Sequence, residues 1–283
     1  TEKGLEAHIA QYLVDENEYV QRENKSYDNV NCIDSELLFQ FLETSQPKAI
    51  AKLKQYHKEL YKQKIIKRFN DQVQAKGIID VLRKGITDGF TDTKLQLFYD
   101  KPVSAYNATA NALYQANIFS VMRQVFFSPS NKKSLDLMVF INGIPVVSFE
   151  LKNELTKQNV AHAIKQYKTD RDPNEELFRL GRLLVNFAVD TEEVWMCTHL
   201  KAHKSYFLPF NKGNNNGAGN PNNPIGIKTD YLWKEILTKN SVTAILQNFC
   251  QLITKEKEYL DKKGKTKTRK EKKLLFPRYH QLV

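Results

Sequence analysis

The chain has 283 residues, 41% of them hydrophobic, which is enough for a large domain with a buried core. No apolar run is long enough to span a bilayer, and charges interrupt the N-terminal stretch TEKGLEAHIAQYL, so we expect neither a membrane segment nor a secretion signal. The net charge of +11 points to an acidic partner, and the spacing of Cys32, Cys197 and Cys250 fits reduced core cysteines of a cytoplasmic protein rather than a zinc site.

The N-terminal third of the chain has helical periodicity. Residues 1–14 predict a helix, and residues 35–85 predict a longer helical region in which apolar side chains recur every three to four positions. We expect residues 35–85 to be an elaboration wrapped on a core that begins with β-rich sequence near Leu95 and continues through residues 118–127.

The segment LDLMVFINGIPVVSFELKN, from Leu135 to Asn153, predicts a β-hairpin with an Asn142-Gly143 turn. Because side chains alternate along a strand, Ser148, Glu150 and Lys152 share one face of the second strand. Acids and a lysine inside an apolar hairpin are costly to bury unless they pair or bind a metal.

The register of this hairpin decides whether Asp136 can act together with Glu150. A regular two-residue turn places Asp136 opposite Phe149, on the wrong face. A three-residue loop ending in a bulge, or a bulge near Pro145, would bring Asp136 opposite Glu150, and some irregularity is expected beside Pro145 because it has no N–H for the ladder. We therefore predict the bulged register.

Two converging carboxylates form a hard oxygen site suited to Mg²⁺ or Mn²⁺. Asp136 and Glu150 are the predicted ligands, and Lys152 would position the attacking water or stabilise developing charge. Pattern alone also allows a surface Asp and a Glu–Lys pair at a strand end. In either case we expect Lys152→Ala to cost little stability, as at other surface positions.

Beyond the hairpin, a helix is predicted at about residues 160–168 and strands near residues 183–188 and 194–198, giving a mixed α/β sheet. Residues 212–226 are rich in Asn and Gly and predict a surface loop, and helical patterning returns from Asp230 to about Leu260. Residues 255–273 hold ten Lys/Arg against four acids, which indicates a solvated helix or linker with nucleic-acid contact as a secondary role. Gly264-Lys265-Thr266 lacks the first glycine of a P-loop, so no ATP site is predicted.

The Asp…Glu-x-Lys hairpin resembles the core of the PD-(D/E)xK nucleases. Four longer segments resemble the restriction subunit (HsdR) of type I restriction–modification enzymes. They are VFINGIPVVSFELKN, NIFSVMRQVFF before it, the segment from His203 to Leu237 after it, and the C-terminal LLFPRYHQLV. The last of these is similar to the opening of that family's helicase-like motor. The resemblance covers nearly the whole chain.

The resemblance also implies supporting residues. Glu6 matches an acid that approaches the metal from the first helix, although a solvated helix Glu would look the same. Tyr167 matches the Tyr of a Gln-x-x-x-Tyr element, but Ala163 stands where the Gln is expected, and Gln166 on the same helical face is a candidate substitute. The DNA-contact candidates are Arg123, Gln124 and Lys165, and surface polarity would explain these equally well.

The resemblance implies a PD-(D/E)xK restriction-endonuclease-like α/β fold, with a mixed sheet flanked by helices. We expect an endonuclease domain at residues 1–210, a loop and helical extension at 211–260, and a basic linker at 261–283 leading into a helicase-like motor. Metal ligands would be Asp136, Glu150 and the Leu151 carbonyl. The implied function is Mg²⁺- or Mn²⁺-dependent cleavage of double-stranded DNA, with ATP used only by the motor and with methyltransferase (M) and specificity (S) subunits as partners. Two alternatives stay open: a docking module with an inactive nuclease fold, and a repair exonuclease of the same fold.

Overall fold

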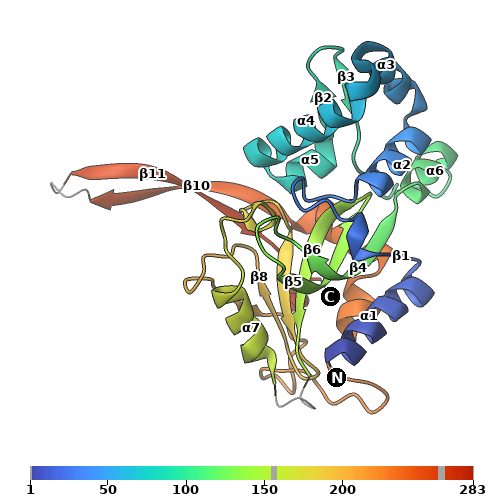
Figure 1. Ribbon diagram of the computed structural model, residues 1–283. Helices are drawn as coiled ribbons and strands as arrows, with labels where there is room; N and C mark the ends of the chain where they lie inside the picture. The colour runs from blue at the N-terminus through green and yellow to red at the C-terminus, as the bar shows by residue number, and fades with distance from the viewer. Residues whose placement is uncertain (1, 154–157, 261–264, 283) are drawn as a thin grey trace.

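The structure, a computed structural model, describes residues 2–153, 158–260 and 265–282. Its centre is a seven-stranded mixed sheet with helices on both faces (Figure 1). The strand order is β1-β4-β5-β6-β7-β8-β9, in which β1 runs parallel to β4, β6 runs parallel to β7, and the other neighbours are antiparallel. The predicted mixed α/β fold is confirmed.

The strands of the central sheet are short and mostly buried. Their bounds are β1 (Val20–Arg22), β4 (Phe119–Phe126), β5 (Ser134–Ile141), β6 (Ile144–Leu151), β7 (Val185–Val189), β8 (Val194–Cys197) and β9 (Leu208–Pro209). The expected strands in residues 118–127, 183–188 and 194–198 are confirmed within one or two residues.

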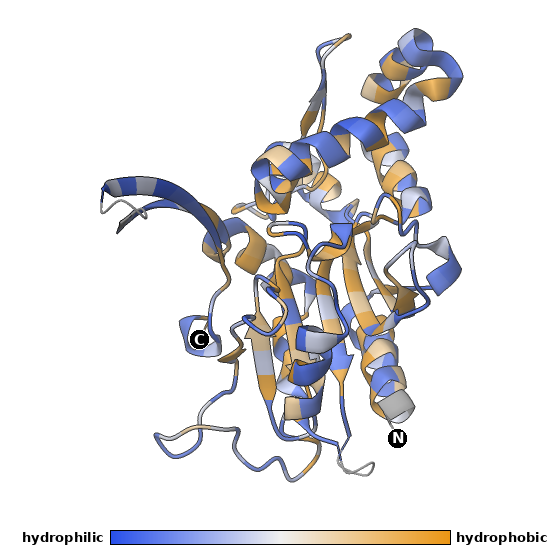
Figure 2. Cartoon of the chain, turned by 60° about the vertical axis from the view of Figure 1, so that its left-hand side comes forward, coloured by the Kyte–Doolittle hydropathy of each residue, from blue (hydrophilic) through white to orange (hydrophobic). Residues whose placement is uncertain are grey.

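Two hydrophobic cores lie on opposite faces of the sheet. Leu137 and Val139 belong to the core covered by α1 (Glu2–Asn17), while Met138 and Phe140 belong to the core covered by α7 (Val160–Thr169). The alternation follows from the two-residue period of a strand. Figure 2 shows hydrophobic colour gathered in the central strands, while the helices mix hydrophobic and hydrophilic residues.

A helical layer covers the turn end of the hairpin (Figure 1). It consists of α2 (Ser35–Ser45), α3 (Pro47–His57), α4 (Tyr61–Lys76) and α5 (Ile78–Lys84), with the small hairpin β2 (Ile86–Asp88) and β3 (Thr93–Leu95). The Asp34 side chain caps α2 by accepting from Leu37 N–H, and Pro47 occupies the first turn of α3, where its missing N–H costs nothing. The predicted helical elaboration at 35–85 is confirmed.

The turn of the hairpin is the expected Asn142-Gly143 pair. Both residues have positive φ, at 52° and 77°, as a type I′ turn requires. A Cβ at position 143 would lie 2.2 Å from the Asp34 carbonyl oxygen, so the close approach of the helical layer also requires glycine there.

Two parts of the chain differ from the sequence expectations. Residues 108–115 form helix α6 (Ala108–Gln115), begun by the Asn107 cap, inside a stretch expected to be β-rich. The second difference concerns the helix expected to continue to about Leu260, which is wrong beyond Phe249. The helical part consists of the short segments Leu232–Ile236, α8 (Lys239–Ala244) and Ile245–Phe249. The chain instead forms an antiparallel ribbon of β10 (Gln251–Leu260) and β11 (Thr266–Leu275).

The described part of the basic segment is therefore mainly strand rather than helix or linker, because residues 251–260 form hydrogen bonds with residues 266–275 instead of within one helix. Residues 261–264, including Gly264 of the rejected P-loop match, lie outside the described part of the chain. The domain boundaries at 210 and 260 stay predictions. The three cysteines are free and buried, as expected, and no helix in the described ranges is long and apolar enough to cross a membrane.

Candidate active site

The hairpin β5–β6 brings Asp136 and Glu150 to opposing positions. Val139 pairs with Val147 but Phe140 pairs with Pro145, so Val146 is an extra residue in β6. Beyond this bulge Leu137 pairs with Phe149, and the next position places Asp136 across from Glu150. The predicted bulge beside Pro145 is confirmed.

Asp136 is anchored to the backbone of the neighbouring strand. Its Oδ2 accepts a hydrogen bond of 2.7 Å from Leu151 N–H, one residue after Glu150. This bond fixes the Asp136 carboxylate at the end of β6, where the sequence interpretation requires it.

Glu150 is a fully buried acid with one satisfied oxygen. Its Oε1 accepts from Arg171 Nε at 2.6 Å in an ion pair whose two side chains are both almost completely buried. Among the described residues its Oε2 has no hydrogen-bond partner. Burial raises the pKa of Glu150 to about 8; the Arg171 charge opposes this rise, and the Asp136 charge adds to it.

Lys152 lies on the same side of β6 as Glu150, and its charge acts to lower the pKa of Glu150. The backbone N–H of Lys152 donates to the Val189 carbonyl at 2.8 Å, which extends the β6–β7 pairing past the strand. Only 7% of the residue is exposed. It is therefore not a solvated strand-end lysine, so the premise for a small, surface-like stability cost of its removal does not hold, and the cost itself stays to be measured.

A chain of hydrogen bonds joins Glu6 of α1 to Glu150. Glu6 is buried and accepts from Arg123 Nε at 2.5 Å and from Gln124 Nε2 at 2.6 Å. Gln124 in turn accepts from the Ser134 hydroxyl at 2.9 Å, and the Ser134 carbonyl accepts from Arg171 Nη2 at 2.7 Å. Arg171 completes the chain at Glu150.

The structure thus places Glu6, Arg123 and Gln124 in one network with Glu150. Arg123 and Gln124 were candidates for DNA contact, and here their side chains bind Glu6. Gln124 has a φ of 51°, a backbone conformation that residues other than glycine rarely adopt. Such conformations are concentrated at functional sites. Its backbone carbonyl accepts from Asn24 Nδ2 at 3.1 Å, which helps to hold this conformation.

Helix α7 carries the remaining predicted residues. Tyr167 is fully buried, its hydroxyl lies 2.8 Å from Ser148 Oγ, and burial raises its pKa well above the ordinary value, with the Glu150 charge adding to the rise. Gln166 is half-buried and its side chain makes no hydrogen bond with the described residues, while Lys165 is exposed. The structure therefore brings Tyr167, but not Gln166, into contact with the face that holds Glu150.

The donor set fits a small divalent cation. Within the described ranges, no group of three or more His, Cys, Asp and Glu side chains gathers as a metal cage. Two carboxylates and a nearby backbone oxygen are instead typical of Mg²⁺, which keeps several water ligands. The second oxygen of Glu150, Oε2, is buried without a hydrogen-bond partner among the described residues, and a divalent cation would satisfy it.

Sequence reasoning missed Arg171 and Ser134. Arg171 follows α7 by two residues and lies 21 positions from Glu150, so no local spacing connects them. The segment Thr169-Asp170-Arg171-Asp172 has the composition of a polar helix end, and nothing in it indicates a buried partner for Arg171.

Comparison with known proteins agrees with this architecture. Residues 2–205 match the family model described as type I restriction enzyme R protein N terminus. Over 85 residues the chain is 31% identical to a protein of Methanocaldococcus jannaschii described as a type I restriction enzyme MjaIXP endonuclease subunit. That alignment covers 30% of this chain and 8% of the relative, so the chain spans only a small part of that relative's length.

Proposed function

The chain belongs to the family of type I restriction enzyme R protein N termini, and on that premise we propose that it is the endonuclease domain of such an enzyme. It would hydrolyse phosphodiester bonds of double-stranded DNA with the help of Mg²⁺ or Mn²⁺. The observation that carries the proposal is the bulged hairpin, which sets Asp136 against Glu150 and leaves a buried carboxylate oxygen of Glu150 unsatisfied.

The roles of the residues follow from their positions. Asp136, Glu150 and the Leu151 carbonyl would hold the cation, which when bound supplies charge stabilisation and a more acidic water. Lys152, mostly buried on the same side as Glu150, would orient the attacking water and stabilise negative charge on the phosphate. Arg171 positions Glu150 through the Nε–Oε1 bond, and the contacts to Glu6 extend that support to α1.

The activity of the whole enzyme reaches beyond this chain. We infer that cleavage is coupled to ATP-driven translocation by a motor elsewhere in the enzyme, and that methyltransferase and specificity subunits select the DNA. This domain would then contact phosphates more than base edges. Its DNA-contact candidates are Arg123, Gln124 and Lys165, of which exposed Lys165 is the most accessible.

The test is nicking of supercoiled plasmid by the 283-residue chain with Mg²⁺ or Mn²⁺, together with calorimetric Mn²⁺ titration. We expect Asp136→Asn and Glu150→Gln each to abolish nicking and weaken Mn²⁺ binding. Glu18→Gln, which removes an acid that is 79% exposed, should change neither. Nicking at the normal rate by both carboxylate variants would refute the proposal.

Lys152→Ala separates chemistry from metal binding. It should retain Mn²⁺ binding but reduce the nicking rate by about 10²–10³, as expected when one stabiliser of transition-state charge is removed. Because Lys152 is mostly buried, the melting temperature must be measured alongside. A chain that binds Mn²⁺ and DNA but never nicks, alone or in the assembled enzyme, would favour the docking-module alternative.

A further inference from the structure

The β10–β11 ribbon projects from the body of the protein as a long arm (Figure 1). Residues directly opposite each other in an antiparallel pair share a face, and alternate residues point to opposite faces. We name as the basic face the positions 253, 255, 257 and 259 of β10 with 267, 269, 271 and 273 of β11.

The charge on the ribbon is concentrated on the basic face. That face carries five cations and one acid, which are Lys255, Lys257, Lys267, Arg269, Lys273 and Glu271. The other face carries two cations, Lys270 and Lys272, and two acids, Glu256 and Glu258. The same ribbon is therefore strongly positive on one face and balanced on the other.

Of the charged pairs that lie directly opposite each other in the ribbon, Lys255–Glu271 and Glu256–Lys270 are opposite in sign, but one pair is not. Lys257 lies directly opposite Arg269, and like charges in that relation destabilise a strand pair. An isolated two-stranded hairpin is marginal in water, and these outer positions bury no apolar core. The Arg269 guanidinium lies 6.0 Å from the Tyr259 ring, a contact that partly compensates. A polyanion on this face would turn the repulsion into attraction.

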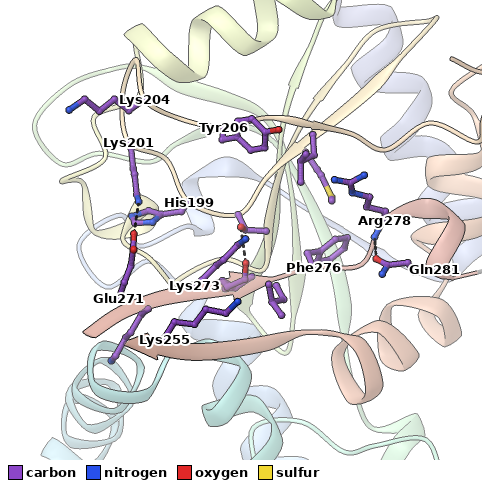
Figure 3. A pocket seen from close by; sticks show the side chains of 16 residues that line it. His199, Lys201, Lys204, Tyr206, Lys255, Glu271, Lys273, Phe276, Arg278 and Gln281 are labelled. Atoms are coloured by element: carbon purple, nitrogen blue, oxygen red, sulfur yellow. Dashed lines mark hydrogen bonds and ion pairs between the residues drawn. The ribbon is translucent and has the colours of Figure 1, made fainter. Parts of the chain in front are cut away.

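The basic face continues into a hollow at the root of the arm (Figure 3). A cavity of about 640 Å³ lies between the ribbon and the segment that follows β8. Six cations line it, namely Lys201, Lys204, Lys255, Lys272, Lys273 and Arg278, and Glu271 is the single acid among the described residues that do so. Tyr206, which is 75% exposed, also lines the cavity.

Helix α7 links this hollow to the candidate active site. It packs across β6, β7 and β8, and it carries Lys165 and Lys168. Helix α7 therefore adds two lysines to the side of the sheet that extends from β8, beside the hollow, to β6, which holds Glu150.

We propose that the basic face of the ribbon and the hollow at its root bind the sugar–phosphate backbone of duplex DNA, as a holding site outside the catalytic network. That the ligand is DNA rests on the proposed function, whereas the attraction of this surface for phosphates does not. Successive cations on one strand of the face are about 6.8 Å apart, twice the roughly 3.4 Å axial spacing of phosphates along one DNA strand. A two-stranded ribbon also fits the major groove, about 12 Å wide. Contacts to phosphate predict binding that ignores base sequence and weakens with salt.

The test is fluorescence anisotropy of the 283-residue chain with a 30-base-pair duplex, in EDTA so that no cleavage occurs, over a series of salt concentrations. Lys257→Gln/Arg269→Gln/Lys273→Gln removes three charges from the basic face. The matched control, Lys48→Gln/Lys64→Gln/Lys94→Gln, removes three exposed charges from the helical layer. Circular dichroism and the melting temperature establish that both variants are folded.

We expect the basic-face variant to bind at least ten-fold more weakly at 100 mM salt and to lose about 0.9 from the salt-dependence slope for each phosphate contact removed. The control should change affinity less than three-fold. Within the ribbon, Lys257→Gln should weaken binding more than Lys270→Gln, which removes the same charge from the balanced face.

Equal weakening by the two triple variants would overturn the proposal in favour of unspecific attraction by net charge. Unchanged DNA binding by the basic-face variant would also overturn it and point to an acidic protein as the partner. Nicking is a separate measurement, because none of the altered residues belongs to the network around Glu150. If the natural chain fails to nick DNA while the basic-face variant shows the expected loss of DNA binding, only the proposed function is contradicted.

Discussion

At the scale of single residues, the buried acid Glu150 gives folding an unusual pH dependence. Its pKa is raised from 4.5 to about 8 by burial, so the folded chain keeps this proton over a range in which the unfolded chain releases it. The unfolded state then binds fewer protons, and the contribution of Glu150 to the free energy of unfolding decreases as pH rises. Between about pH 4.5 and 8 this loss should be on the order of a few kcal/mol.

The prediction is checked by urea denaturation at several pH values in EDTA, with Glu150→Gln as the comparison. The variant has no proton to lose at this position, so its stability should fall less steeply over that range. Adding Mg²⁺ should stabilise the natural chain increasingly as pH rises, because the ion binds the ionised carboxylate. If the free energy of unfolding changed with pH in the same way for both proteins, Glu150 would not retain its proton in the folded chain.

Arg171 provides a second test at the residue scale. Arg171→Met removes the partner of a buried carboxylate, and above pH 8 we expect a loss of about 3–5 kcal/mol in the free energy of unfolding. At pH 5 the loss should be smaller, because Glu150 then keeps its proton.

The double variant Arg171→Met/Glu150→Gln should recover much of this loss, since neither buried charge is left alone. Denaturation of the four proteins of this cycle measures the coupling between the two residues. Additive losses would show that Arg171 supports the fold through its packing on Phe127, whose ring centre lies 5.2 Å away, rather than through Glu150.

At the scale of elements, the hairpin was predictable because its chemistry is local. Asn142 and Gly143 specify the turn, and Pro145 marks the irregularity beside it. From those three residues the sequence indicated which acids face each other. The helices at 35–85 and 160–168 were equally readable from their apolar spacing.

Features that depend on distant pairing were not predictable. The stretch LITKEKEYL follows a helically patterned segment and carries four consecutive charges of alternating sign, and its pairing with KTRKEKKLL makes it a strand. Arg171 contacts Glu150 because α7 packs on the sheet, and this packing cannot be inferred from the sequence of either segment alone. The roles of Asp136, Glu150 and Lys152 came from motif and family resemblance, and they stay predictions until activity is measured.

Helix α7 yields a prediction at this scale. Tyr167 holds the helix to β6 through the Ser148 hydroxyl, which also donates to Asn186 Oδ1 at 2.8 Å. Tyr167→Phe keeps the buried ring and removes one hydrogen bond, so we expect a loss of about 0.5–1.5 kcal/mol of stability. If Tyr167 only positions the helix, nicking should stay within a few-fold of normal. A loss of 10²-fold with an unchanged melting temperature would instead assign Tyr167 a part in the reaction.

At the scale of the whole molecule, stability is divided between a buried sheet and an exposed arm. The strands β5 and β6 are buried on both faces, whereas residues 255–258 and 267–270 of the arm are exposed. We expect amide hydrogens of the arm to exchange far faster than those of β5 and β6, because opening the arm exposes little apolar surface. Hydrogen exchange followed by mass spectrometry measures this directly. Protection in the arm equal to that of the sheet, without DNA, would contradict this expectation and show that further contacts hold the arm.

The extra residue at Val146 has a consequence for how this segment can change. Asp136 lies six residues before Asn142, whereas Glu150 lies seven residues after Gly143, and the bulge absorbs the difference. Deleting Val146 would remove the bulge and still leave Asp136 across from Glu150. Deleting both Val146 and Val147 would shift the register by one residue and turn the acids to opposite faces. The stretch should therefore tolerate the loss of one residue but not of two, which nicking by the two deletion variants would measure.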